Sequence, residues 1–200
     1  IIENAHRILG GASLNLSNRT SDFFFKECED PKEMQNLLIH YVADSLPGFT
    51  GESEIQVLSP VRKRQLGVDH LNEVLQARLN PKKDGEPVAK NGFRIGDRVI
   101  QTVNDYNREK SFCKNPKKKE LGVFNGDLGR VIDIDQEDEK VTIEFEDGWL
   151  TSYDYLELDA LSLSYALTIH KSQGSEFPVV VIPVYDYIPM LTSMNLLYTG

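Results

Sequence analysis

The chain has 200 residues, of which 40% are hydrophobic and 26% are charged, and its formal net charge is −9. This composition is typical of an ordinary globular protein, and the length is enough for one domain with a full core or one that carries a small insertion. The acidic balance argues against a basic protein that wraps around nucleic acid, but it is compatible with a narrow groove that makes few contacts.

No apolar run in the sequence is as long as a transmembrane helix, and the N-terminus lacks the pattern of a signal peptide. Cys28 and Cys113 lie far apart and have no metal-ligand spacing. We therefore expect a cytoplasmic protein with reduced thiols, no metal site and no membrane partner.

Amphipathic helices and one short strand are expected before residue 80. Apolar residues recur at helical spacing in Ile1–Gly11. Asp30 is placed to cap a second helix, with Pro31 at its first position. Ile55–Ser59 is expected to be a short strand, and Val68–Leu79 has the apolar stripe of a helix that follows it. Such a strand-to-helix junction is typical of the sheet edge where α/β proteins bind ligands.

The hydrophobic pattern changes at Asn80–Asn91, a connector rich in Pro, Gly and Lys. Beyond it, alternating apolar residues predict several short strands, which is typical of a small SH3-like barrel. The expected strands are Arg94–Val103, Leu128–Asp135, Lys140–Phe145 and Trp149–Tyr153. The lysine-bearing segment Asn107–Gly122 is expected to be a mobile loop, either a solvated excursion or a nucleic-acid contact.

Ser164–Val184 reads as a short apolar strand, a polar turn over Thr168–Glu176 and a β-branched strand. Apolar runs this short suit strands that are buried on both faces, as in a parallel sheet. Gly174 stands where the turn needs a positive φ, which only glycine adopts without steric cost. Polar side chains after such a strand lie where α/β proteins bind ligands, although a solvated surface turn has the same composition.

The string TIHKSQGSEF in this turn resembles motif V of superfamily 1 helicases, and it is similar in particular to the RecD-like branch, which includes TraA- and Dda-type enzymes. The resemblance implies that one side of the turn faces single-stranded DNA and the other faces a nucleotide held between two RecA-like domains. The implied DNA contacts are Thr168, His170, Lys171 and Ser172, and the implied nucleotide contacts are Gly174 and Glu176. A structural role at the strand end is the alternative for the histidine.

The segment Ser59–Arg62 resembles motif IV of the same family, and by that resemblance Arg62 is the catalytic arginine that reaches the γ-phosphate of ATP. An arginine suits this role because its planar fork contacts phosphate oxygens bidentately and never loses its charge. An ordinary surface arginine is the alternative. The sequence departs from the family pattern at Arg64, where the family commonly has glycine.

Further segments resemble the RecD-like pattern in the same order along the chain. Asn4–Ile8 is similar to a string that follows motif III, and Met194–Gly200 resembles the opening of motif VI. The strings GDRV, NDY and VFNGDLG between them resemble the SH3-like insertion of the family. The resemblance implies an α/β fold in which an incomplete RecA-like parallel-sheet domain, the second motor domain (residues 1–91 and 155–200), carries an inserted SH3-like barrel (residues 92–154).

The implied function is the C-terminal part of an ATP-dependent, 5′-to-3′ DNA helicase that supplies single-stranded DNA contacts and part of the ATP site. The sequence contains no P-loop string, so we expect no ATPase activity from this chain alone, and ATP and Mg²⁺ only in the full-length enzyme. The expected partners are single-stranded DNA, the first RecA-like motor domain of the same polypeptide and subunits of an exonuclease complex. The alternative is a non-enzymatic nucleic-acid-binding or regulatory module with a degenerate helicase-like fold.

Overall fold

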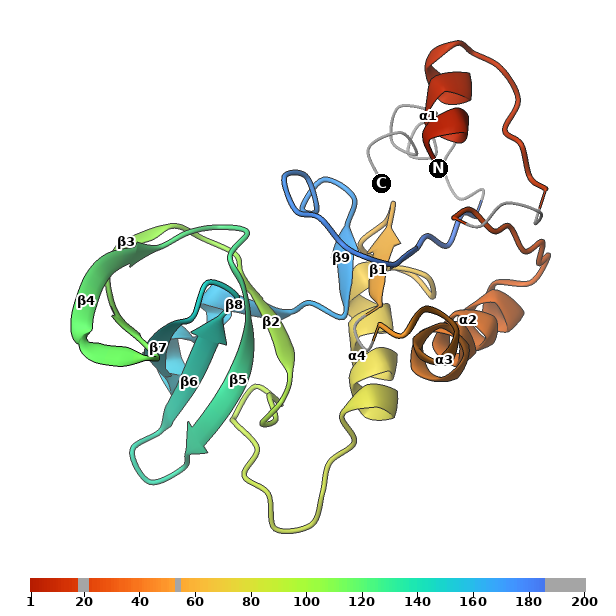
Figure 1. Cartoon of the computed structure of the whole chain (residues 1–200). Helices are drawn as coiled ribbons and strands as arrows, with labels where there is room; N and C mark the ends of the chain where they lie inside the picture. The colour runs from red at the N-terminus through yellow and green to blue at the C-terminus, as the bar shows by residue number, and fades with distance from the viewer. Residues whose placement is uncertain (18–21, 53–54, 186–200) are drawn as a thin grey trace. The chain divides into compact units, whose positions relative to one another are not determined.

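The computed structural model describes residues 1–17, 22–52 and 55–185. The chain divides into two compact units, which Figure 1 shows in colours that run from the N-terminus to the C-terminus. The first unit comprises Ile1–Leu71 and Ala166–Gly200, and the second is Asn72–Tyr165. The expected motif VI segment, Met194–Gly200, lies outside the described residues.

The first unit is built from short helices and a three-stranded parallel sheet. Its sheet has the order β10-β1-β9, and both neighbours run parallel to the central strand. Every residue of β1 is buried, as expected for a strand covered on both faces. The elements are α1 (Ile2–Leu9), α2 (Pro31–His40), the π-helical turn η1 (Tyr41–Ser45), α3 (Leu46–Thr50), β1 (Gln56–Ser59), α4 (Val68–Leu79, which continues into the second unit), β9 (Ala166–Thr168) and β10 (Val180–Val181).

The expected start of α2 is confirmed by its cap. The carboxylate of Asp30 accepts hydrogen bonds from the backbone N–H groups of Lys32 and Glu33, at 2.6 and 3.0 Å. These bonds satisfy two of the donors that every helix start leaves without a partner, and Pro31 occupies the first helical position.

The second unit is a seven-stranded antiparallel sheet with the order β4-β3-β7-β6-β5-β2-β8. It curves around an apolar core that includes Val99, Val131, Val141 and Ile143, all buried. Within the described residues, β4 and β8 are the edges, so hydrogen bonds do not close the sheet into a barrel. The elements are β2 (Arg98–Gln101), β3 (Asp105–Phe112), β4 (Asn115–Val123), β5 (Leu128–Asp135), β6 (Lys140–Phe145), β7 (Trp149–Asp154), the 3₁₀ helix η2 (Tyr155–Ala160) and β8 (Leu161–Leu163).

The lysine-bearing segment Asn107–Gly122 was expected to be a loop, and that expectation is wrong. It forms most of the β3–β4 hairpin, which pairs Asp105 with Val123 and Lys110 with Glu120. The alternating apolar pattern is missing because most of β4 is exposed at the edge of the sheet. Charged side chains on an edge strand discourage pairing with other chains, which accounts for a strand of this composition.

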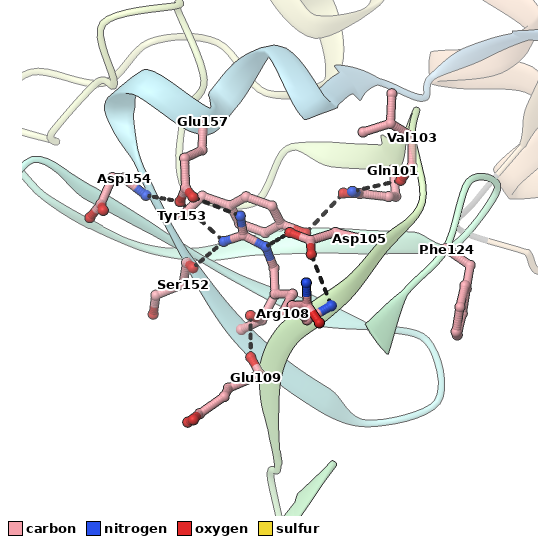
Figure 2. Close-up of polar contacts among 12 residues, drawn as sticks. Gln101, Val103, Asp105, Arg108, Glu109, Phe124, Ser152, Tyr153, Asp154 and Glu157 are labelled. Carbon is pink, nitrogen blue, oxygen red and sulfur yellow. Dashed lines mark hydrogen bonds and ion pairs between the residues drawn. The ribbon is translucent and has the colours of Figure 1, made fainter. Parts of the chain in front are cut away.

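The base of the β3–β4 hairpin is fixed by Arg108, whose side chain is 12% exposed. Its guanidinium forms a bidentate ion pair with Glu157 at 2.9 and 3.1 Å, and Nε donates to Asp105 at 2.9 Å (Figure 2). It also donates to Ser152 O and stacks 4.1 Å from the ring centroid of the buried Tyr153. One side chain thereby joins β3, β7 and η2.

A buried carboxylate joins α4 to the sheet within the second unit. Asp97 is fully buried and accepts hydrogen bonds from the side chains of Gln76, Asn80 and Tyr165 and from Arg94 N. Burial, followed by the nearby charge of Asp97, raises the pKa of the Tyr165 phenol, so the hydroxyl stays a donor. A buried charge is tolerated when its acceptor sites are filled in this way.

Candidate nucleotide and nucleic-acid site

Two loops leave the same edge of the parallel sheet. Residues Ser59 and Thr168 are the last register partners of β1 and β9, and Ile169 N donates to Ser59 O at 3.4 Å. Because the strands are parallel, the loop that carries Arg62 and the turn that begins at Thr168 start at neighbouring positions of the carboxyl edge. This is the edge at which open α/β sheets bind ligands.

The loop after β1 folds back on itself ahead of α4. Ser59 Oγ donates to Leu66 O at 2.6 Å and accepts from Val61 N at 3.2 Å. The N–H of Val68 donates to Val61 O at 3.1 Å, at the start of α4. These bonds hold the loop in one closed conformation, which a serine at the strand end makes possible because its hydroxyl is both a donor and an acceptor.

The departure from the family pattern at Arg64 lies at a position where the backbone is left-handed. Its φ is +78°, a left-handed conformation that glycine adopts without strain, so the turn has the geometry that favours glycine although an arginine occupies it. Gly67 is required for a different reason. A Cβ at that position would lie 2.3 Å from Lys63 O, so no larger residue fits the closed loop.

The guanidinium of Arg62 lies at the surface, with 75% of the side chain exposed. Its Nε donates to Asp69 Oδ1 at 3.2 Å, and Asp69 N donates to Arg62 O at 3.0 Å. Asp69 thus holds both the backbone and the side chain of this arginine. The sequence interpretation missed Asp69, and the signal that could have found it is an acidic residue in the first turn of the helix after the motif.

The polar turn after β9 is stabilised by its own hydroxyl groups. Lys171 N donates to Thr168 O at 2.9 Å, and Thr168 Oγ1 lies 3.3 Å from the same N–H. Ser172 is buried, and its Oγ donates to Ile169 O at 2.8 Å. The expected positive φ of Gly174 is confirmed at +88°. Both hydroxyls therefore shape the turn, and that of Ser172, an expected DNA contact, is buried within it.

The other expected site residues of the turn are exposed overall, although the ammonium of Lys171 is partly buried. His170, Lys171 and Glu176 are exposed. Partial burial of the ammonium, followed by the positive charge of Arg62, lowers the pKa of Lys171. The structure therefore brings Lys171 within electrostatic range of Arg62, although the sequence interpretation assigned the two cations to different ligands.

The donor groups at this edge fit phosphate better than a metal ion. Two cations lie on neighbouring loops, and cationic side chains are typical phosphate ligands. Across residues 1–17, 22–52 and 55–185, no group of three or more His, Cys, Asp or Glu side chains could hold a metal ion. No helix in the same ranges is long and apolar enough to cross a membrane.

Comparison with known proteins finds family models that match two segments of the chain. Residues 71–145 match the ATP-dependent RecD-like DNA helicase SH3 domain, and residues 163–200 match the UvrD-like helicase C-terminal domain. The ATP-dependent RecD2 DNA helicase of Deinococcus radiodurans is 43% identical over 151 residues, which cover 75% of this chain and 19% of that protein. The chain belongs to the RecD-like helicases.

Further RecD-like relatives extend the match. The RecBCD enzyme subunit RecD of Mycolicibacterium smegmatis is 29% identical over 178 residues, which cover 88% of this chain and 28% of that subunit. A crystal structure of Pif1 helicase from Bacteroides in complex with ADP-AlF3 and single-stranded DNA matches 98% of this chain and 45% of that chain, with a TM-score of 0.55 and 18% identity. That likeness shows a shared fold. The chain spans less than a third of the length of these RecD relatives.

Proposed function

We propose that this RecD-like chain is part of the second motor domain of an ATP-dependent DNA helicase, residues 1–91 and 155–200, with an inserted SH3-like unit over residues 92–154. In this proposal it contributes single-stranded DNA contacts and part of the ATP site. The observation that carries the proposal is the shared carboxyl edge of β1 and β9, from which the loop of Arg62 and the turn of Thr168 both leave.

On the nucleotide side, Arg62 would contact the γ-phosphate, and Gly174 and Glu176 would line the nucleotide. Negative charge moves onto the phosphate oxygens in the transition state. A guanidinium that is already oriented toward these oxygens stabilises this charge without reorganisation. The contact between Arg62 and Asp69 supports this role because it orients a guanidinium that is otherwise exposed. Mg²⁺ would be held by other parts of the full-length polypeptide and would supply charge neutralisation at the phosphates.

On the DNA side, Thr168, His170 and Ser172 would contact the backbone of the strand, and the family resemblance implies Lys171 as a further DNA contact. Hydroxyl and imidazole groups suit phosphate and sugar contacts, which position a strand without reading its sequence. The partners in this proposal are single-stranded DNA, the first motor domain of the same polypeptide and subunits of an exonuclease complex; one relative is named as the RecD subunit of the RecBCD enzyme. We propose 5′-to-3′ polarity, a cytoplasmic location and no ATPase activity for this chain alone.

The test uses the full-length polypeptide that contains this chain. Arg62→Ala is expected to lower kcat of the DNA-stimulated ATPase by about a hundredfold or more, with unchanged affinity for oligo(dT) in the absence of nucleotide. Lys63→Ala, an exposed cation in the same loop, is the matched control and should behave as the wild type. Thr168→Ala combined with His170→Ala should weaken oligo(dT) binding.

Two results would contradict the proposal. A wild-type kcat in the Arg62→Ala protein would show that this arginine is not part of the ATP site. If the Thr168→Ala, His170→Ala protein keeps its fold and binds DNA with wild-type affinity, the turn is not part of the DNA site. Both results together would favour the alternative, a non-enzymatic or regulatory module that retains a helicase-like fold.

A further inference from the structure

Two cationic side chains leave one edge of the parallel sheet on neighbouring loops. Ser59 and Thr168 are register partners at the ends of β1 and β9. Arg62 stands three residues after Ser59, and Lys171 stands three residues after Thr168. The guanidinium of Arg62 and the ammonium of Lys171 therefore belong to loops that begin at paired strand ends, and each follows its strand end by the same number of residues.

The charges of these two cations are balanced differently. Arg62 Nε pairs with Asp69 Oδ1 at 3.2 Å, whereas Lys171 forms no ion pair within the part of the chain that the structure describes. Partial burial and then the charge of Arg62 lower the pKa of Lys171, so its surroundings disfavour the protonated form. An anion beside both side chains would reverse this, because opposite charge favours the charged form.

The backbone of Lys171 connects this cation to the expected DNA side of the turn. Its N–H donates to Thr168 O at 2.9 Å and lies 3.3 Å from Thr168 Oγ1. Thr168 is one of the residues proposed to hold the DNA backbone. A displacement of Lys171 would therefore change the position of a hydroxyl that the strand would use.

We propose that Lys171 binds the terminal phosphate of the nucleotide beside Arg62 and that it is not a DNA contact. This inference rests on the proposed function, in which Arg62 meets the γ-phosphate. While the γ-phosphate is present, its negative charge compensates both cations. After the phosphate leaves, the two cations repel each other and Lys171 moves. The hydrogen bonds from its backbone N–H to Thr168 then transmit this movement to a residue that would contact the DNA backbone.

The test measures nucleotide and DNA affinity separately in the full-length polypeptide. Lys171→Met is expected to weaken binding of the ATP analogue AMP-PNP by about ten- to a hundredfold, which is the range for a hydrogen bond to a charged group. ADP binding, which does not use the γ-phosphate, should change by less than about threefold, and oligo(dT) affinity without nucleotide should stay within about twofold. Lys171→Arg should keep most of the AMP-PNP affinity, and Lys63→Met is the control for a lost exposed cation.

The outcomes separate this inference from the proposed function. If Arg62→Met weakens AMP-PNP binding but Lys171→Met weakens only oligo(dT) binding, Lys171 is a DNA contact and the inference is wrong. If neither variant changes AMP-PNP affinity, the proposed ATP site itself is wrong. If Lys171→Met and Lys171→Arg both lose ADP and oligo(dT) binding alike, the lysine maintains the shape of the turn, which also overturns the inference.

Discussion

Replacing Arg108 by methionine tests the contact that fixes the β3–β4 hairpin. The substitution keeps an apolar stem of similar reach but removes the bidentate pair with Glu157, the pair with Asp105 and the stack on Tyr153. The stack on a buried ring is worth about 1 kcal/mol. The two ion pairs add about 1 kcal/mol together, because the carboxylates are 32% and 43% exposed and water screens them. We expect a loss of about 2 kcal/mol in the free energy of unfolding.

The assay follows Trp149, the chain's one tryptophan, which is 6% exposed in the sheet of the second unit. Its fluorescence therefore reports the unfolding of this unit in urea. With an m value of about 1.5 kcal/mol/M, a loss of 2 kcal/mol lowers the midpoint by about 1.3 M. Arg108→Lys should lose about half as much, since an ammonium cannot bridge both carboxylates in the same fork geometry. Lys114→Met, which removes an exposed cation from the same hairpin, is the control and should stay within about 0.5 kcal/mol of the wild type.

The stability difference between the wild type and Arg108→Met is also expected to depend on pH. Hydrogen bonds from Arg108 lower the pKa of Glu157. For Asp105, burial acts to raise the pKa, but hydrogen bonds from the Arg108 side chain and from the backbone N–H groups of Asn107 and Arg108, together with the charge of Arg108, lower it on balance. Carboxyl groups with lowered folded-state pKa values stabilise the protein above their ordinary titration range, and this contribution is lost as the pH falls through the folded-state values. The stability difference between wild type and Arg108→Met should therefore shrink as the pH falls from about 7 toward about 3. Equal midpoints at neutral pH, or a difference that grows in acid, would refute the reasoning.

Two further substitutions follow from the buried geometry. Asp97→Asn replaces an acceptor oxygen by a donor where four donors converge, so we expect a loss of about 3 kcal/mol or more in the unfolding of the second unit, read by Trp149 fluorescence. Gly67→Ala places a Cβ 2.3 Å from Lys63 O and should open the loop of Arg62, lowering the DNA-stimulated ATPase of the full-length polypeptide and the thermal stability of the first unit. Gly48→Ala, with open space around its Cβ, is the control, and equal behaviour of the two variants would contradict the closed loop.

Local sequence signals were sufficient to predict the parallel sheet and the edge from which the loop of Arg62 and the turn of Thr168 leave. Asp30 caps its helix as expected, and Gly174 has the expected positive φ, because both features depend on neighbouring residues alone. The burial of Val57 and Leu58 in β1 likewise follows from their apolar side chains, whereas the buried Gln56 and Ser59 depend on hydrogen bonds that the sequence does not show.

Features that depend on distant contacts were not predictable in the same way. The β3–β4 hairpin was missed because an exposed edge strand does not show an alternating apolar pattern. The contact between Arg62 and Asp69 depends on how the loop between them closes, which Ser59 and Gly67 determine together. The electrostatic link between Arg62 and Lys171 arises only when β1 and β9 pair, since more than a hundred residues separate the two cations in the sequence.

The most direct test of the central claim is the effect of nucleotide on DNA affinity. Oligo(dT) affinity of the full-length polypeptide would be measured with and without AMP-PNP, for the wild type and for Arg62→Ala. If this edge of the sheet holds both ligands, AMP-PNP changes the DNA affinity of the wild type, and Arg62→Ala abolishes that change while it leaves the nucleotide-free affinity intact. An unchanged nucleotide effect in Arg62→Ala, at concentrations that saturate the site, would contradict the claim that this edge couples ATP to DNA.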